Sequence, residues 1–155
     1  MRSTTAEASS LRTHMLREHL ELEQTFAALL AAVDGDDRVQ SAKLWSKFDA
    51  RLQAHMQLEE DLILSAFERE HPREAVSIRR EHVEIRRVLL ELGVGVDLHL
   101  IRAEVVERFI ALLRAHAAGE DLQFYLWLQE HLAEDVQMDL VERSRSGIYG
   151  ASGVR

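Results

Sequence analysis

The chain contains no cysteine, which excludes disulfide bonds, thiolate zinc sites, iron–sulfur clusters and cysteine nucleophiles. Proline occurs once and glycine seven times in 155 residues, so residues that interrupt helices are scarce. Alanine, leucine, glutamate and arginine are abundant instead, and all four favour helix over sheet. Hydrophobic residues make up 46% and charged residues 30%, a balance typical of one folded domain. The composition therefore predicts an all-α protein.

A formal net charge of −8, with no basic stripe to offset it, argues against nucleic acid as a partner. Residues 1–10 are mostly small and polar and lack the apolar core of a secretory signal. No apolar run in the chain approaches the length that spans a membrane. We therefore expect a cytoplasmic protein with no nucleic-acid partner and no membrane partner.

Apolar residues recur at steps of three and four in four segments, which predicts four amphipathic helices. Turn residues at 34–35, 71–72 and 93–95 are expected to end the first three helices. The fourth is expected to begin near Asp97 and to end near Leu132. Short turns between consecutive helices predict an antiparallel up-down-up-down four-helix bundle with a short fifth C-terminal helix.

The expected division of the chain has three parts. Residues 1–10 form a flexible N-terminal segment, and residues 11–134 form the four-helix bundle. Residues 135–155 hold a short helix that ends near Arg143, followed by a mobile tail of glycine and other small residues. The sequence thus predicts one domain with appended ends.

The segments His55–Glu60 and His116–Asp121 share one pattern: a histidine, a glutamate four residues later, and a second acid. Residues four apart lie on one face of a helix, so each segment directs an imidazole and a carboxylate the same way. Glu18-His19 and Glu81-His82 form a second repeated pair, and both repeats have a period of about 60 residues. The chain therefore consists of two similar helical hairpins.

Six histidines and glutamates of these motifs lie on the apolar faces of the four predicted helices, at similar heights along the bundle. An unpaired buried carboxylate costs several kcal/mol, so two of them need compensation. A lone histidine on an apolar face is more often an ordinary core residue, and a lone His-x3-Glu pair is more often a surface pair. Four imidazoles and two carboxylates at one level of the bundle instead indicate one or two bound transition-metal ions. The predicted metal ligands are His19, His55, Glu59, His82, His116 and Glu120.

The other four histidines do not share this register. His14 lies five residues before His19 and is expected on the solvated surface. His71 and His99 fall at helix ends, where capping or helix-dipole roles are ordinary. His131, late in the fourth helix, is also expected on the surface.

This ordered set of motifs resembles the hemerythrin-type cation-binding (HHE) domain over roughly residues 11–132. The resemblance implies a four-helix bundle that holds a non-haem di-iron cofactor. In this family two iron ions are bridged by an oxo or hydroxo group and by two carboxylates. Carried over by position, the ligands are Glu59 and Glu120 as bridges, His19 and His55 on one iron, and His82 and His116 on the other.

The chain departs from the oxygen-carrying hemerythrins, which have a fifth histidine one turn before the histidine of the third helix. That position is Ile78 here, and Met15 matches it in the first repeat. Water, or Glu23 one turn after His19, is a candidate for the missing ligand. The fourth-helix motif is His-x3-Glu here. In the oxygen carriers this motif has one more residue between its two ligands and an aspartate in place of the glutamate. These departures favour an oxygen- or peroxide-reactive site over reversible oxygen carriage.

The first functional hypothesis is a small di-iron protein that binds dioxygen, peroxide or nitric oxide at an open coordination position. Met15, Leu52, Ile78 and Leu112 are expected to line its pocket. A second hypothesis is an iron or oxygen sensor, in which metal binding supplies folding free energy and the fifth helix reports to a partner. A peroxidase or catalase-like enzyme is a third, although no substrate-binding motif supports it. Manganese and zinc are also compatible with these ligands.

Overall fold

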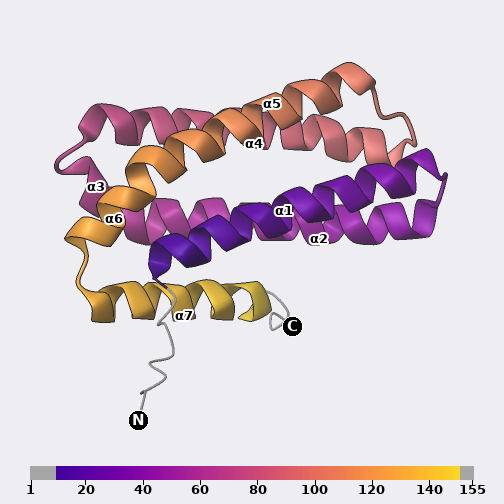
Figure 1. Ribbon diagram of the computed structural model, residues 1–155. Helices are drawn as coiled ribbons and strands as arrows, with labels where there is room; N and C mark the ends of the chain where they lie inside the picture. The colour runs from indigo at the N-terminus through magenta and orange to yellow at the C-terminus, as the bar shows by residue number, and fades with distance from the viewer. Residues whose placement is uncertain (1–9, 151–155) are drawn as a thin grey trace, which may run out of the picture.

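The computed structural model describes residues 10–150, and within that range every regular element is a helix. Helices α1 (Leu11–Asp34) and α2 (Arg38–Leu58) form one antiparallel hairpin. Helices α4 (Pro72–Asp97) and α5 (Ala103–Gly119) form a second, which packs beside the first (Figure 1). No helix in the described range is both long and apolar enough to cross a membrane. The predicted all-α antiparallel bundle is confirmed.

The second and fourth long helices each contain one π-helical turn, which is wider than a turn of α-helix. The first, η1 (Glu59–Ile63), joins α2 to α3 (Leu64–Glu68). The other, η2 (Glu120–Phe124), joins α5 to α6 (Tyr125–His131). Each π turn therefore begins at a glutamate of the predicted metal site.

The π turns change which side chains face the interior of the bundle. The backbone N–H groups of Leu64 and Tyr125 donate to carbonyl oxygens five residues earlier, those of Glu59 and Glu120. Because each turn accommodates one extra residue, the residues after it are rotated relative to a regular helix. Steps of three and four predict continuous α-helix here, so neither turn was expected from the sequence.

Helix α4 passes through Gly93 and Gly95, and the expectation that these glycines end it is wrong. A glycine inside a helix costs only about 1 kcal/mol, which packing can offset. A Cβ atom at position 93 would lie 3.1 Å from Cζ2 of Trp45. Gly93 therefore permits a close approach between α4 and α2, and the helix continues to Asp97.

The late end of α4 also moves the start of the next helix. The chain turns at His99, which has a left-handed φ of 55°. Helix α5 then begins at Ala103 and not near Asp97. The turns predicted at 34–35 and 71–72 agree with the structure, since α1 ends at Asp34 and Pro72 opens α4.

Helix α7 (Glu134–Gly150) lies along the first hairpin and packs against α1 and α2 (Figure 1). It continues past Arg143, where a mobile tail was expected to begin. Residues 1–9 and 151–155, which hold most of the expected flexible ends, lie outside the described residues. The fifth helix is thus longer than the sequence predicts and is part of the packed structure.

The apolar core consists of two clusters with a polar layer between them. The cluster beside α7 includes Met15 and Ile63. The other cluster includes Phe26, Phe48 and Phe109. Along each of the four long helices, the predicted metal ligands lie between residues of one cluster and residues of the other.

Candidate metal centre

The structure brings all six predicted ligands together in this polar layer. They form two groups of four residues that share both glutamates, and each long helix contributes to the set. In each group, one nitrogen or oxygen atom from every residue lies within 4.8 Å of the others. The first group is His19, His55, Glu59 and Glu120, and the second group is Glu59, His82, His116 and Glu120.

Glu59 contacts histidines of both groups. Its Oε1 atom lies 2.7 Å from Nε2 of His55, which precedes it by four residues on the same helical face. Its Oε2 atom lies 3.2 Å from Nε2 of His82 on α4. The two oxygens of one carboxylate thus face different groups, as a bridging ligand requires.

Glu120 also lies close to one histidine of each group, but in its case through a single oxygen atom. Its Oε1 atom contacts Nε2 of His116, four residues earlier, and lies 3.8 Å from Nε2 of His19 across the bundle. Both glutamates therefore connect the two groups.

Burial of this cluster lowers the stability of the folded protein unless a further group binds to its polar atoms. Glu59, His82 and Glu120 have no exposed surface, and His55 and His116 are each 5% exposed. Within residues 10–150, both oxygens of Glu120, Oε2 of Glu59, and Nε2 of His82 and of His116 form no hydrogen bond. Unpaired buried polar atoms cost free energy, and transition metals take imidazole and carboxylate ligands. The donor set therefore fits a metal ion in each group.

The two shared carboxyl groups differ in their pKa values. Burial, together with the negative charge of Glu59, raises the pKa of Glu120 well above its usual value. Burial also acts to raise the pKa of Glu59, but His55 outweighs it and lowers that pKa. The pKa values of these two neighbouring carboxyl groups are therefore shifted in opposite directions.

Three outer carboxylates, Glu18, Glu60 and Glu81, form hydrogen bonds with histidine Nδ1 atoms, and a fourth, Asp121, lies near Nδ1 of His19 without a hydrogen bond. An ionised carboxylate only accepts hydrogen bonds, so Nδ1 carries the proton and the Nε2 lone pair is left for a metal. Each carboxylate comes from a different long helix than its histidine, and the four contacts link the helices in a ring. The pairs are Glu18–His55 at 2.7 Å, Glu60–His82 at 2.8 Å, Glu81–His116 at 2.5 Å and Asp121–His19 at 3.3 Å.

The supporting role of the outer carboxylates was not identified from the sequence. The signal was present, because each of them directly precedes or follows a predicted ligand. Glu60 is itself held by Arg86, whose Nη1 and Nη2 donate to its two oxygens at 2.7 and 3.0 Å. Burial acts to raise the pKa of Glu60, but the hydrogen bonds from Arg86 and His82 lower it.

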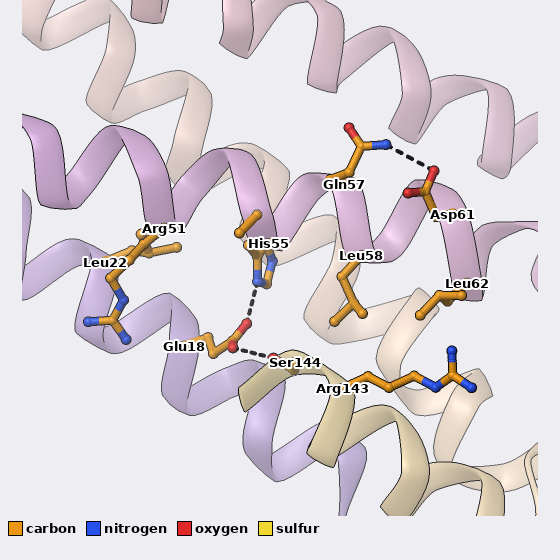
Figure 2. Close-up of a pocket in the computed structure, with 11 residues that line it drawn as sticks. Glu18, Leu22, Arg51, His55, Gln57, Leu58, Asp61, Leu62, Arg143 and Ser144 are labelled. Carbon is orange, nitrogen blue, oxygen red and sulfur yellow. Dashed lines mark hydrogen bonds and ion pairs between the residues drawn. The ribbon is translucent and has the colours of Figure 1, made fainter. Parts of the chain in front are cut away.

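Glu18 is the outer carboxylate that α7 covers (Figure 2). Ser144 of α7 donates to its Oε1 at 2.6 Å, while its Oε2 accepts from Nδ1 of His55. His14 Nε2 lies 3.1 Å from Glu18 and 2.9 Å from the Ser144 hydroxyl. His14 is therefore buried, and its predicted surface position is wrong because α7 packs over it. Its four-residue spacing to Glu18 is the same signal that marked the other pairs.

Tyr125 is a further residue of this cluster that the sequence did not reveal. It is completely buried, and its hydroxyl donates to Oε1 of Glu59 at 2.6 Å. The hydroxyl oxygen also lies 3.0 Å from Nε2 of His19 and 3.2 Å from Nε2 of His55. Tyr125 faces the cluster because the π turn starts at Glu120, five residues earlier, a spacing outside the three-and-four pattern.

An apolar recess of about 370 Å³ opens beside the first group, between α1, α2 and α5. His19, His55 and His116 form part of its wall, and most of the remaining lining is aliphatic or aromatic, including Phe26. The recess therefore connects the surface with three of the predicted ligands.

The predicted lining of this pocket is only partly correct. Leu52 lines the recess. Met15 and Ile78 are instead buried in the cluster beside α7, and Leu112 packs against the other apolar cluster. Regular spacing placed these side chains one turn from the ligands but did not show which of them border open space.

Glu23 does not supply the missing ligand. Its side chain is 64% exposed, and its Oε1 atom lies 3.5 Å from Nη2 of Arg114 on α5. Glu23 therefore points to the rim of the recess and pairs there with a surface cation.

The family model described as Hemerythrin HHE cation binding domain matches residues 10–140, a range that contains all six predicted ligands. Comparison with curated proteins and with solved structures gave no match. The two groups of histidines and glutamates are compatible with a metal-binding helical bundle. The chain belongs to the hemerythrin HHE cation-binding domain family.

Proposed function

We propose that this protein binds two iron ions between its four long helices and takes up dioxygen, peroxide or nitric oxide there. The observation that carries the proposal is the pair of histidine and glutamate groups that share two carboxylates. Iron suits a site of imidazole and carboxylate ligands. The proposed ligands are His19 and His55 for the first ion, His82 and His116 for the second, and Glu59 and Glu120 for both.

Bound iron would supply an open coordination position and a change of oxidation state. The protein's own residues prepare the site for it. The outer carboxylates orient the imidazole rings and make their Nε2 atoms better donors. The two apolar clusters surround the polar layer on either side and bury most of its side chains. The recess of about 370 Å³ admits a small molecule easily, since one water molecule takes up only about 30 Å³.

The test is the visible spectrum of the iron-loaded protein before and after exposure to dioxygen, hydrogen peroxide and nitric oxide. At least one of the three is expected to change the spectrum. Filling the recess with an Ala27→Trp substitution should slow that change several-fold, because Ala27 lines the recess. Ala28→Trp is the matched control, since the neighbouring Ala28 is exposed and does not line it. A spectrum that none of the three reagents changes would rule out small-ligand binding, and catalytic turnover of peroxide would indicate an enzyme.

A sensor is a second candidate function, and the contact between α7 and the metal centre favours it. Ser144 donates to Glu18, and Glu18 accepts from the predicted ligand His55, so two hydrogen bonds link the fifth helix to the site (Figure 2). A metal that fixes His55 would also fix Glu18 and, through it, the docking of α7. A partner that recognises α7 would then respond to metal binding.

A Ser144→Ala substitution tests this link. Loss of the hydroxyl removes a hydrogen bond that orients Glu18, and we expect iron to bind several-fold more weakly, up to about 10-fold. Ser146→Ala is the control, because Ser146 is exposed on the same helix. Amide hydrogen exchange in α7 should also be slower in the iron-loaded protein than in the metal-free protein. If iron affinity and exchange in α7 both stay unchanged, α7 does not sense the metal.

A further inference from the structure

We propose that the hydroxyl oxygen of Tyr125 is a fifth protein ligand of the first metal position, so that the two metal positions are chemically different. This inference rests on the proposed function, because it assigns a new ligand to the same centre. Tyr125 differs from both earlier candidates for a further ligand, water and Glu23, and it adds a donor to the first position and none to the second.

The distances around the Tyr125 oxygen are those between neighbouring ligands of one metal ion. With bonds of about 2.1 Å and right angles between them, two adjacent ligand atoms are separated by about 3 Å. The Tyr125 oxygen lies 2.6 Å from Oε1 of Glu59, 3.0 Å from Nε2 of His19 and 3.2 Å from Nε2 of His55. The two Nε2 atoms are themselves 3.1 Å apart. Each of these pairs therefore has the spacing of two neighbouring ligands of one metal ion.

Tyr125 reaches this position through a local feature of the backbone. Helix α5 directs His116 and Glu120 to the centre at a four-residue spacing, and η2 then widens the helix. The N–H of Tyr125 donates to the carbonyl of Glu120 five residues earlier, so this side chain returns to the same face. One continuous helical segment thus supplies three residues to the centre.

The equivalent position in the first half of the chain carries no donor. Leu64 follows Glu59 by five residues across η1, just as Tyr125 follows Glu120 across η2. Leu64 is also completely buried, but its side chain has no nitrogen or oxygen. The second group therefore keeps four protein ligands while the first gains a fifth. An external ligand would bind preferentially to the second metal ion, which has the more open coordination sphere and whose proposed ligand His116 also lines the recess.

Ligation by Tyr125 forms a bond between its oxygen and the metal and releases the hydroxyl proton to solvent. Within the protein alone, that proton is donated to Glu59. Tyrosine is an established protein ligand of ferric iron, where it binds as a phenolate. An anionic oxygen ligand favours iron(III) over iron(II), so the first position would hold the more strongly oxidised ion of the pair.

The test compares iron(III)-loaded wild-type protein with the Tyr125→Phe and Tyr149→Phe variants, which together cover both tyrosines of the chain. The wild type should show a visible tyrosinate-to-iron(III) charge-transfer band with tyrosine vibrations in its resonance Raman spectrum. Tyr125→Phe should lose this band completely, and Tyr149→Phe should keep it. Tyr125→Phe should also bind one of its two iron ions about 10-fold more weakly and leave the other unchanged.

The possible results separate this inference from the proposed function. If the wild type binds two iron ions but shows no tyrosinate band, or if Tyr125→Phe keeps the band, Tyr125 is not a ligand and the di-iron proposal stands. Equal weakening of both iron ions in Tyr125→Phe would also overturn the inference, because the tyrosine would then act through the shared Glu59. If the wild type binds no iron, the proposed function fails and the inference fails with it.

Discussion

Replacement of Glu120 by alanine is expected to remove most of the bound iron, from about two ions per chain to well below one. Glu120 belongs to both groups, and its carboxylate is completely buried among the four histidines. Its loss takes a ligand from both metal positions at once and leaves neither with two carboxylates. Iron content of the purified, reconstituted variant is the measurement. A variant that still binds two ions would show that the ligand assignment is wrong.

Two further variants distinguish the loss of a metal ligand from a general loss of stability. Glu120→Gln keeps the size of the side chain but removes the negative charge, and it should lose iron to a similar extent if ligation is the cause. Glu84→Ala should keep its iron, because Glu84 lies on the surface of α4, where it pairs with Arg87 and is not one of the proposed ligands. Circular dichroism of each variant shows whether the helices are still formed. Loss of iron from Glu84→Ala as well would point to a general loss of stability.

Iron loading is expected to raise the melting temperature by about 5–10 °C. A ligand that binds only the folded state contributes about 2.7 kcal/mol at a concentration 100-fold above its Kd, and each kcal/mol corresponds to about 2–4 °C for a protein of this size. The physical source is the buried cluster, where several polar atoms have no hydrogen-bond partner among the residues that the structure describes. Metal binding pairs these atoms, so its free energy becomes folding free energy. Differential scanning calorimetry of metal-free and iron-loaded protein measures the difference.

Two controls accompany the melting experiment. Magnesium prefers a shell of oxygen ligands and water, so it should raise the melting temperature much less than iron. Iron should have little effect on the Glu120→Gln variant, which lacks a shared ligand. Equal melting temperatures for metal-free and iron-loaded wild type would mean that the metal contributes nothing to folding. That result would rule out the sensor hypothesis.

The sequence predicts most of the bundle because the relevant information is local. Apolar steps of three and four define each helix, and the same periodicity shows that His55 and Glu59 share a face with apolar neighbours. Antiparallel pairing then brings His19 level with His55, and the structure does place these residues together. Whether the six residues bind metal stays a prediction, which the iron experiments test.

The features that the sequence does not predict depend on distant contacts or on small changes of the backbone. A single π turn rotates Tyr125 into the cluster, and no step of three or four indicates it. His14 is buried only because α7, far along the chain, supplies Ser144. Gly93 resembles a helix end, yet its contact with Trp45 makes it part of a packed interface. In each case tertiary packing decides between alternatives that are close in local free energy.

The measurement that tests the central claim most directly is the metal content of the purified protein, before and after reconstitution with iron, together with its absorption spectrum. Two groups of ligands that share Glu59 and Glu120 predict about two iron ions per chain and an iron charge-transfer spectrum. A chain that binds no iron under either condition would contradict the claim. The buried histidines and glutamates would then be a polar layer of a helical bundle without a metal.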